Sequence, residues 1–213
     1  MEALDQITAT LAMTMGLAWA SGINLYATLL TLGFLSNSGN IDLPPDLQVV
    51  ANPLVMGAAG IMYFIEFFVD KTPGADSGWD AIHTFIRIPA GAMLAAGAVG
   101  HLDPAVEIAA ALLGGSLAAG THATKAGTRV LINTSPEPFS NWVASIGEDI
   151  AVVTGVWASI NHPVSFLIAL VLFVILMVWL LPRIWVGVKK VFRFILGWFR
   201  KEESPTDFNL PSN

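Results

Sequence analysis

The sequence predicts an all-α protein, a bundle of six transmembrane helices, from its composition and from the length and spacing of its apolar runs. Of 213 residues, 54% are hydrophobic and only 12% are charged, and the mean hydropathy is +0.66. Soluble domains carry about 25% charged residues. Several apolar runs reach roughly 20 residues, the length that crosses a hydrocarbon core of about 30 Å. These observations exclude a soluble enzyme, a nucleic-acid-binding protein and a disordered chain.

Six spans follow one another along the chain, separated by Pro, Gly and Asn residues that break helices. We expect them at residues 7–35, 50–69, 77–100, 105–132, 139–160 and 163–182. The first and fourth exceed 20 residues, so we expect them to tilt, bend or protrude. Ser21, Gly22 and Asn24 lie near the middle of the first span, where we expect a bend or a hydrogen bond between helices.

The positions of the charges predict the orientation. With six spans, both termini share a side with the connections at 70–77 and 133–139, and the ten Lys and Arg residues fall on that side or in helices entering from it. The other side has only acids: Asp42, Asp46, Asp103 and Glu107. The positive-inside rule then predicts cytoplasmic termini, in the inner membrane of the cell. The acidic N-terminus does not resemble a signal peptide, so we expect the first apolar run to remain as a helix.

The composition changes after the membrane domain, residues 1–182. In residues 183–201, aromatic and aliphatic side chains recur at helical spacing, and Lys and Arg occupy the other faces. This pattern predicts an amphipathic helix in the cytoplasmic interface that is attracted to anionic lipid. A helix that binds a partner protein is the alternative. We expect residues 202–213 to be disordered.

Two segments indicate an internal repeat. Residues 70–79 align without gaps on residues 133–142. The identical pairs are Pro73/Pro136, Ser77/Ser140 and Trp79/Trp142. A duplication in this register would make two parallel helical hairpins, and transporters often bind substrate at the interface between repeats.

Charged side chains inside the predicted spans are the strongest functional signal, because a charge in hydrocarbon requires a partner or a task. They fall on helical faces of four spans. The candidate residues for substrate binding, ion binding or coupling are Asn24, Glu66, Asp70, Asp80, His83, Arg87, Lys125, Arg129, Glu148 and Asp149. Arg87 lies about 15 Å along its helix from residue 77, close to the bilayer midplane, and Glu148 and Asp149 reach a similar depth.

Two interpretations of the midplane charges remain open. In the structural one, Arg87 pairs with Glu148 or Asp149 and fixes the third span to the fifth. One Arg cannot neutralise two carboxylates, so the second acid would be protonated, paired with Lys125 or Arg129, or in contact with water. A carboxylate in that position is what a proton relay or a coupled carrier requires.

The acids near the cytoplasmic end admit three roles. Asp76 stands where it can cap the third span. Glu66, Asp70, Asp80 and His83 supply ligands for a divalent cation, and Asp76, Asp80 and His83 are the candidate metal set. Alternatively, the N-termini of the third and fifth spans, with the bases of the fourth, receive an anionic group. With no Cys and no catalytic motif in the chain, we expect no cofactor apart from such a cation.

Three segments carry a resemblance to a known family. They are residues 20–28 (Ala-Ser-Gly-Ile-Asn-Leu-Tyr-Ala-Thr), residues 70–84, which begin Asp-Lys-Thr-Pro-Gly, and residues 133–141 together with Gly147-Glu148-Asp149. Over residues 8–182 the chain resembles the bacterial membrane family catalogued as domain of unknown function 4126, which has relatives in plants. The resemblance implies a multi-pass membrane protein and no particular activity.

These features favour a secondary transporter of a small charged solute or ion, with Glu148 or Asp149 as the coupling group. Two alternatives come from other classes. One is an intramembrane, metal-dependent enzyme that acts on a lipid or polyprenyl headgroup, although an enzyme is the less favoured class. The other is a membrane scaffold or assembly protein whose ion pairs only specify packing. The expected partners are lipid and the solute or ion, without nucleic acid, and Gly-rich helix faces are compatible with a homodimer.

Overall fold

The computed structural model describes residues 2–134 and 139–201, and this described part contains helices and no strand. The α-helices are α1 (Glu2–Asn37), α2 (Pro53–Val69), α3 (Ala75–Val99), α4 (Pro104–Ile132), α5 (Phe139–Asn161) and α6 (Pro163–Lys201), and a 3-10 helix, η1 (Pro45–Ala51), precedes α2. The prediction of an all-α protein is confirmed. The tail at 202–213, expected to be disordered, lies outside the described residues.

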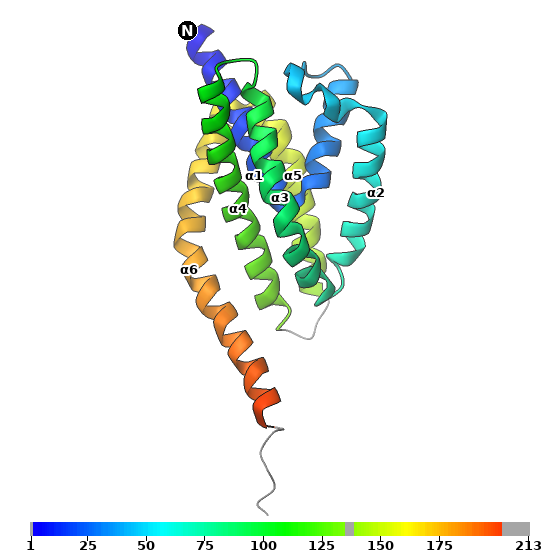
Figure 1. Cartoon of the computed structure of the whole chain (residues 1–213), viewed down its shortest axis with the longest axis vertical. Helices are drawn as coiled ribbons and strands as arrows, with labels where there is room; N and C mark the ends of the chain where they lie inside the picture. The colour runs from blue at the N-terminus through cyan, green and yellow to red at the C-terminus, as the bar shows by residue number, and fades with distance from the viewer. Residues whose placement is uncertain (1, 135–138, 202–213) are drawn as a thin grey trace, which may run out of the picture.

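Helices α2 to α6 run up and down the long axis of the molecule (Figure 1). Helices α3 and α4 form the most extensive pair. Gly91 on α3 faces Ala118, and Gly114 on α4 faces Ala95, so small side chains let the two backbones approach closely, as in many membrane helix pairs. Helix α2 packs mainly against α1 and stands at the edge of the bundle.

Helix α1 doubles back inside the bundle. Asn24 has φ −146° and ψ 99°, so two helical segments meet there. The first segment descends from the end of the molecule that carries the N-terminus, and the second returns to that end (Figure 1). Contacts agree, because Ile7 lies in a groove with Val106 at the start of α4 and Asn37 donates to the Ala51 carbonyl just before α2. The path differs from the single crossing expected at 7–35, although the bend lies where we expected it.

The exterior of the bundle is apolar. By length and composition, five described helices could cross a membrane, or six if η1 and α2 form one bent span. Large exposed side chains such as Phe64, Phe85, Leu112 and Ile175 cover the outer faces of α2, α3, α4 and α6, while several Asp, Glu, Lys and Arg side chains are buried. This arrangement inverts that of a soluble protein. It fits an integral, multi-pass membrane protein.

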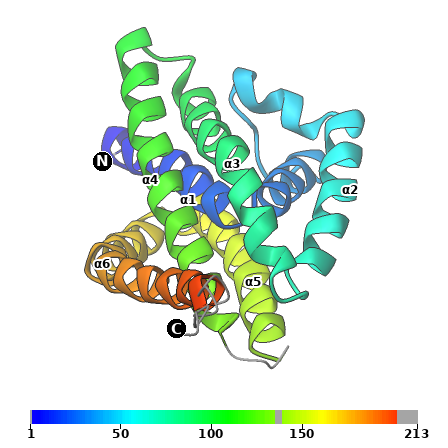
Figure 2. The same ribbon diagram turned by 60° about the horizontal axis from the view of Figure 1, so that its bottom comes forward.

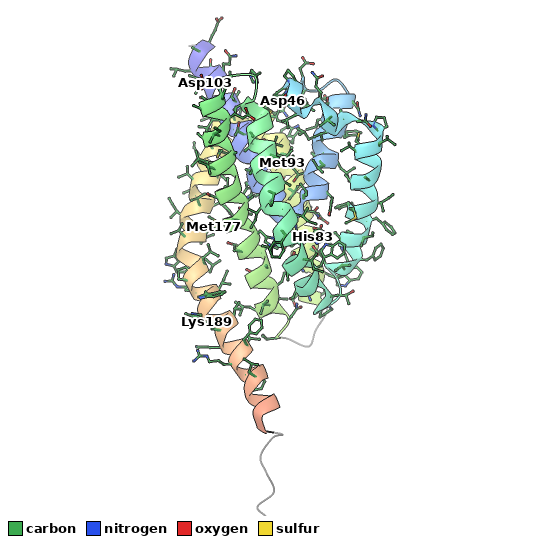
Figure 3. The ribbon with its side chains drawn as sticks, in the orientation of Figure 1. Asp46, His83, Met93, Asp103, Met177 and Lys189 are labelled. Atoms are coloured by element: carbon green, nitrogen blue, oxygen red, sulfur yellow. The ribbon has the colours of Figure 1, made fainter. Side chains whose placement is uncertain are left out.

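The two ends of the bundle differ in charge. Asp46 and Asp103 lie at the end with the N-terminus, whereas Lys189 lies toward the other end (Figure 3). The N-terminus and the end of α6 are at opposite ends of the long axis (Figure 1). The reason is that α1 returns to the end at which it starts, and the five α-helices that follow then end at the opposite side. This arrangement differs from our expectation that both termini share one side.

Helix α6 continues through Pro182 as one helix of 39 residues. At 1.5 Å per residue it is about 58 Å long, roughly twice the thickness of a hydrocarbon core. Its C-terminal part extends past the other helices (Figures 1 and 2). Residue 183 is therefore not a helix boundary, and the interfacial position of 183–201 stays a prediction.

The internal repeat also stays a prediction. The aligned segments at 70–79 and 133–142 lead into α3 and α5 at the same end of the bundle. Trp79 and Trp142 lie within the first five residues of these two helices. Parallel hairpins require a placement of this kind.

Substitution of Gly114 by Val should loosen the α3–α4 pair, because a Cβ at Gly114 would collide with the Cβ of Ala95. We expect the free energy of unfolding in detergent to fall by about 1–3 kcal/mol, the usual range for an overpacked interior. Gly57→Val is the matched control, since a Cβ there meets nothing within 4 Å. An equal loss in both variants would contradict the packing described.

The re-entrant path of α1 can be tested by cysteine labelling, since the chain contains no Cys. Gln6→Cys and Thr72→Cys place exposed thiols in the N-terminal turns of α1 and in the α2–α3 connection. We expect a membrane-impermeant maleimide to label them from opposite sides of sealed vesicles. Labelling of both from one side would show that α1 crosses the membrane once.

Candidate functional site

The break in α1 brings backbone groups into contact with polar side chains in the middle of the bundle. The Asn24 side chain caps the second segment, since its Oδ1 accepts a hydrogen bond from the Ala27 N–H at 2.9 Å. At the end of the first segment, the Ile23 carbonyl accepts a hydrogen bond from Lys125 Nζ at 3.1 Å. Helix α4 therefore supplies a partner that the interrupted helix lacks.

Seven charged side chains gather next to this break, and we call them the buried charge cluster. They come from α2, α3, α4, α5 and the residue that follows α2, and each lies within 4 Å of an oppositely charged member. The members are Glu66, Asp70, Asp80, Arg87, Lys125, Arg129 and Glu148. Six have side chains at most 4% exposed, and that of Glu148 is 21% exposed. All seven were candidates from the sequence.

Arg87 joins α3 to α2. Its Nη2 lies 2.7 Å from Glu66 Oε1, and its Nη1 lies 2.8 Å from Asp80 Oδ1, two turns earlier on α3. The pairing with Glu148 or Asp149 that we considered from the sequence does not form. The long Arg side chain extends along its own helix toward the end of α2, so that Arg87 meets acids lying closer to the membrane interface.

His122 on α4 lies against this pair and was not among the site residues predicted from the sequence. Its Nδ1 is 3.2 Å from Arg87 Nη1. A guanidinium can only donate, so Nδ1 accepts and the imidazole is neutral, with its proton on Nε2. Nε2 faces the Asp80 carbonyl at 3.1 Å and Thr84 Oγ1 at 2.8 Å. His122 thus orients Arg87 without adding positive charge.

Lys125 lies at the centre of the cluster. Besides the Ile23 carbonyl, it lies within 4 Å of four carboxylates, which come from α2, the residue that follows α2, α3 and α5. The distances from Nζ are 2.9 Å to Asp70 Oδ2, 3.4 Å to Glu148 Oε2, 3.5 Å to Glu66 Oε1 and 3.8 Å to Asp80 Oδ1. One ammonium group therefore connects the break in α1 with α2, α3 and α5.

Arg129 closes the cluster on the side of α5. Its Nη2 and Nε approach the two carboxylate oxygens of Glu148 at 2.7 and 3.2 Å, a bidentate pair. Its Nη1 donates to the carbonyls of Asp70 and Asn141, both at 3.1 Å. The guanidinium thus holds the end of α2 and the start of α5 together, and Asn141 is another contact that sequence reasoning missed.

The cluster holds more acid than base. Four carboxylates face three bases, which leaves a formal charge of −1 if every group is ionised. One carboxylate oxygen on each of Glu66, Asp70 and Asp80 is buried and has no hydrogen-bond partner within the described residues. Because unpaired charge is costly at this depth, the cluster favours the uptake of one positive charge.

Asp149 lies beside the cluster and differs from its members. Its Oδ1 accepts a hydrogen bond from Asn24 Nδ2 at 3.0 Å, and its Oδ2 accepts one from Tyr63 OH at 3.1 Å. Both donors are neutral, and within the described residues no Lys or Arg nitrogen lies within 4 Å of it. Asp149 is therefore a carboxylate at the break in α1 whose partners do not require it to be ionised.

The candidate metal residues do not form a metal site. Asp76 Oδ1 accepts hydrogen bonds from the backbone N–H groups of Gly74 and Ser77 and from Asn133 Nδ2. Asp76 thus satisfies a backbone N–H in the first turn of α3, whereas the N-cap residue is Gly74 and has no side-chain cap. His83 (Figure 3) pairs with Tyr26 OH at 3.0 Å. Across the described residues, no three His, Asp or Glu side chains are arranged to hold a metal ion.

Lys71 and Tyr63, which sequence reasoning did not select, connect α2 to α5. Lys71 Nζ lies 3.0 Å from the centre of the Phe67 ring and donates to Ser145 Oγ at 3.2 Å. Burial lowers the pKa of the Lys71 ammonium below its usual value, and the charge of Asp149 acts in the opposite direction. The sequence contains a pattern that could have revealed them, because Tyr63, Phe67 and Lys71 are spaced at i, i+4 and i+8 and therefore share one helical face.

The comparison with known proteins gives a family. Residues 11–183 match the family described as domain of unknown function (DUF4126). The chain belongs to this family. The match covers α1 from residue 11, all of α2 to α5 and the first half of α6, so both the break in α1 and the cluster lie within it. No curated protein and no solved structure matches the chain.

Removal of the Arg87 charge should be strongly destabilising, because two buried acids would lose their main partner. We expect Arg87→Met to lower the free energy of unfolding in detergent by about 3–5 kcal/mol. The double variant Arg87→Met/Glu66→Leu should recover part of this loss. Arg183→Gln, which removes an exposed charge on α6, is the control and should change stability little. Equal stability of all variants would show that the cluster does not hold the fold.

Proposed function

We propose that this protein is a secondary transporter of a small charged solute or ion. The observation that carries the proposal is the central re-entrant helix α1, whose break meets the buried charge cluster. Non-helical backbone at membrane depth is tolerated only inside protein or along a cavity. In many transporters, broken helices of this kind bring backbone groups to the substrate and the coupling ion.

Proton coupling fits the charge balance of the cluster. The seven members of the cluster carry a formal charge of −1, and an ionised Asp149 beside them would raise the excess to −2. A proton on Asp149 therefore lowers the negative charge that the low-dielectric interior must hold. We assign the exchangeable proton to Asp149 in preference to Glu148, the other candidate from the sequence. Glu148 forms ion pairs with Arg129 and Lys125, whereas Asp149 has neutral donors on both oxygens.

Helix α2 is placed to act as the gate. It packs mainly on α1, and two hydrogen bonds join it and the connection that follows it to α5, from Tyr63 to Asp149 and from Lys71 to Ser145. Protonation of Asp149 would weaken the first of these contacts, because a carboxylic acid accepts hydrogen bonds less strongly than a carboxylate. The hydrogen bond from Tyr63 to Asp149 would then couple the protonation of Asp149 to the movement of α2.

A scaffold or assembly role remains the second candidate, because the cluster joins five segments of the chain through ion pairs. The intramembrane enzyme loses its support, since its chemistry depended on a metal held by Asp76, Asp80 and His83. For the transporter we propose the inner membrane, with the Lys- and Arg-rich end in the cytoplasm.

Proton coupling through Asp149 is tested by proton movement in proteoliposomes that contain a pH-sensitive dye. Gradients of sodium, potassium, magnesium and manganese chlorides, of phosphate and of an amino-acid mixture are imposed in turn. We expect at least one gradient to drive protons through the wild-type protein and Asp149→Asn to lower that rate at least 10-fold, because an amide cannot take up a proton.

Glu107→Gln is the control, as it removes an exposed acid from α4 far from the cluster, and it should transport like the wild type. Reconstitution and folding of each variant are checked by circular dichroism and size-exclusion chromatography. A folded wild-type protein that moves no protons under any gradient, or an Asp149→Asn variant with full activity, would overturn the assignment.

A further inference from the structure

Two adjoining hollows lie along α6 at the Lys- and Arg-rich end of the bundle. The larger, about 620 Å³, is an apolar groove between α3, α4 and α6, lined by residues such as Ala81, Ala126, Val130, Ile184 and Trp185. The second, about 420 Å³, lies further along α6. The two share Trp185, Val188 and Phe192. The two hollows therefore adjoin along α6, and we call them together the α6 channel.

The second hollow is where the channel becomes basic. Lys189 and Arg193 line it, and since they are four residues apart they lie one turn from each other on the same helical face. Both are exposed, and Lys189 Nζ lies 5.2 Å from the centre of the Trp185 ring. Trp is the residue that typically marks the level of lipid headgroups. The apolar groove thus ends in two cations at an interfacial Trp.

We propose that this channel binds one anionic phospholipid, with an acyl chain in the α3–α4–α6 groove and the phosphate between Lys189 and Arg193. Arg and Lys side chains both donate charge-assisted hydrogen bonds to phosphate oxygens. The sequence of α6 contains no Asp or Glu, so nothing on this helix would pair with the ammonium group of a zwitterionic headgroup. Basic pockets between membrane helices are known to bind anionic lipid headgroups. The site is separate from the charge cluster and does not depend on transport.

A lipid site requires more than positive charge, and two pairs of bases on α6 allow the two contributions to be separated. Arg183 and Lys190 carry the same charges on the same helix but line neither hollow, and the Arg183 guanidinium stacks on Trp179. A purely electrostatic attraction to the membrane would depend equally on Arg183, Lys189, Lys190 and Arg193. A built lipid site would use Lys189 and Arg193.

The test is native mass spectrometry of the purified full-length protein with added phosphatidylglycerol or phosphatidylcholine. The wild type should bind one phosphatidylglycerol more tightly than phosphatidylcholine. Lys189→Gln/Arg193→Gln should weaken that binding roughly 30-fold, as expected for two interfacial cations. Arg183→Gln/Lys190→Gln, with the same loss of charge, should weaken it less than about 3-fold.

The position of the acyl chain is tested by fluorescence. Phosphatidylglycerol brominated on its chains should quench the wild-type protein more than the Trp185→Phe variant, and Ala123→Phe, which adds a ring to the groove, should reduce quenching. Equal binding of the two lipids, an equal effect of the two double variants, or a lipid-free dimer in which a second copy covers the groove would each overturn the proposal. None of these outcomes bears on proton movement through Asp149.

Discussion

The Lys125 ammonium is the group on which the centre of this fold depends, because a charge in a layer without water must find its partners within the protein. No single helix can supply them. Lys125 takes a carbonyl from the break in α1, and carboxylates from α2, α3, α5 and the α2–α3 connection. The same contacts satisfy the backbone of α1 at the point where its own hydrogen bonds stop. The interrupted helix and the buried ammonium therefore stabilise each other, and each would be costly alone.

The sequence predicted the helices well and their pairing poorly. The limits of α2 to α5 followed from apolar runs and from breakers such as Pro104 and Gly74, and the charged faces followed from helical spacing, since both depend on local periodicity. Which acid meets which base depends on side-chain length and on the relative heights of helices, so Arg87 reached Glu66 and Asp80 instead of the α5 acids. The reversal of α1 was also hidden. Asn24 marked a bend, but its angle is set by contacts from α4 that are distant in sequence.

Stability and transport make opposite demands on the charge cluster. A scaffold is best served by exact neutralisation, because every unpaired buried charge weakens it. Here one acid is in excess, three carboxylate oxygens lack partners within the described residues, and Asp149 is held by two neutral donors. The firm pairs lie around Arg87 and Arg129, while the adjustable contacts lie between α2 and α5. Helix α2 therefore takes part in both kinds of contact: Glu66, near its C-terminal end, is fixed to Arg87, whereas Tyr63, one turn earlier, has an adjustable contact with Asp149.

The positions of the acids and bases fit the re-entrant path of α1 better than the single crossing expected from the sequence. The first 70 residues contain no Lys or Arg, so the positive-inside rule, which counts bases, says nothing about the side on which the N-terminus lies. The earlier placement of both termini on one side rested only on counting residues 7–35 as a crossing. Once α1 re-enters, Glu2 and Asp5 join Asp46 and Asp103 at one end, and every base of the connections and of α6 lies at the other. The reversal at Asn24 thus places the two N-terminal acids at the same end as Asp46 and Asp103, without moving a single positive charge.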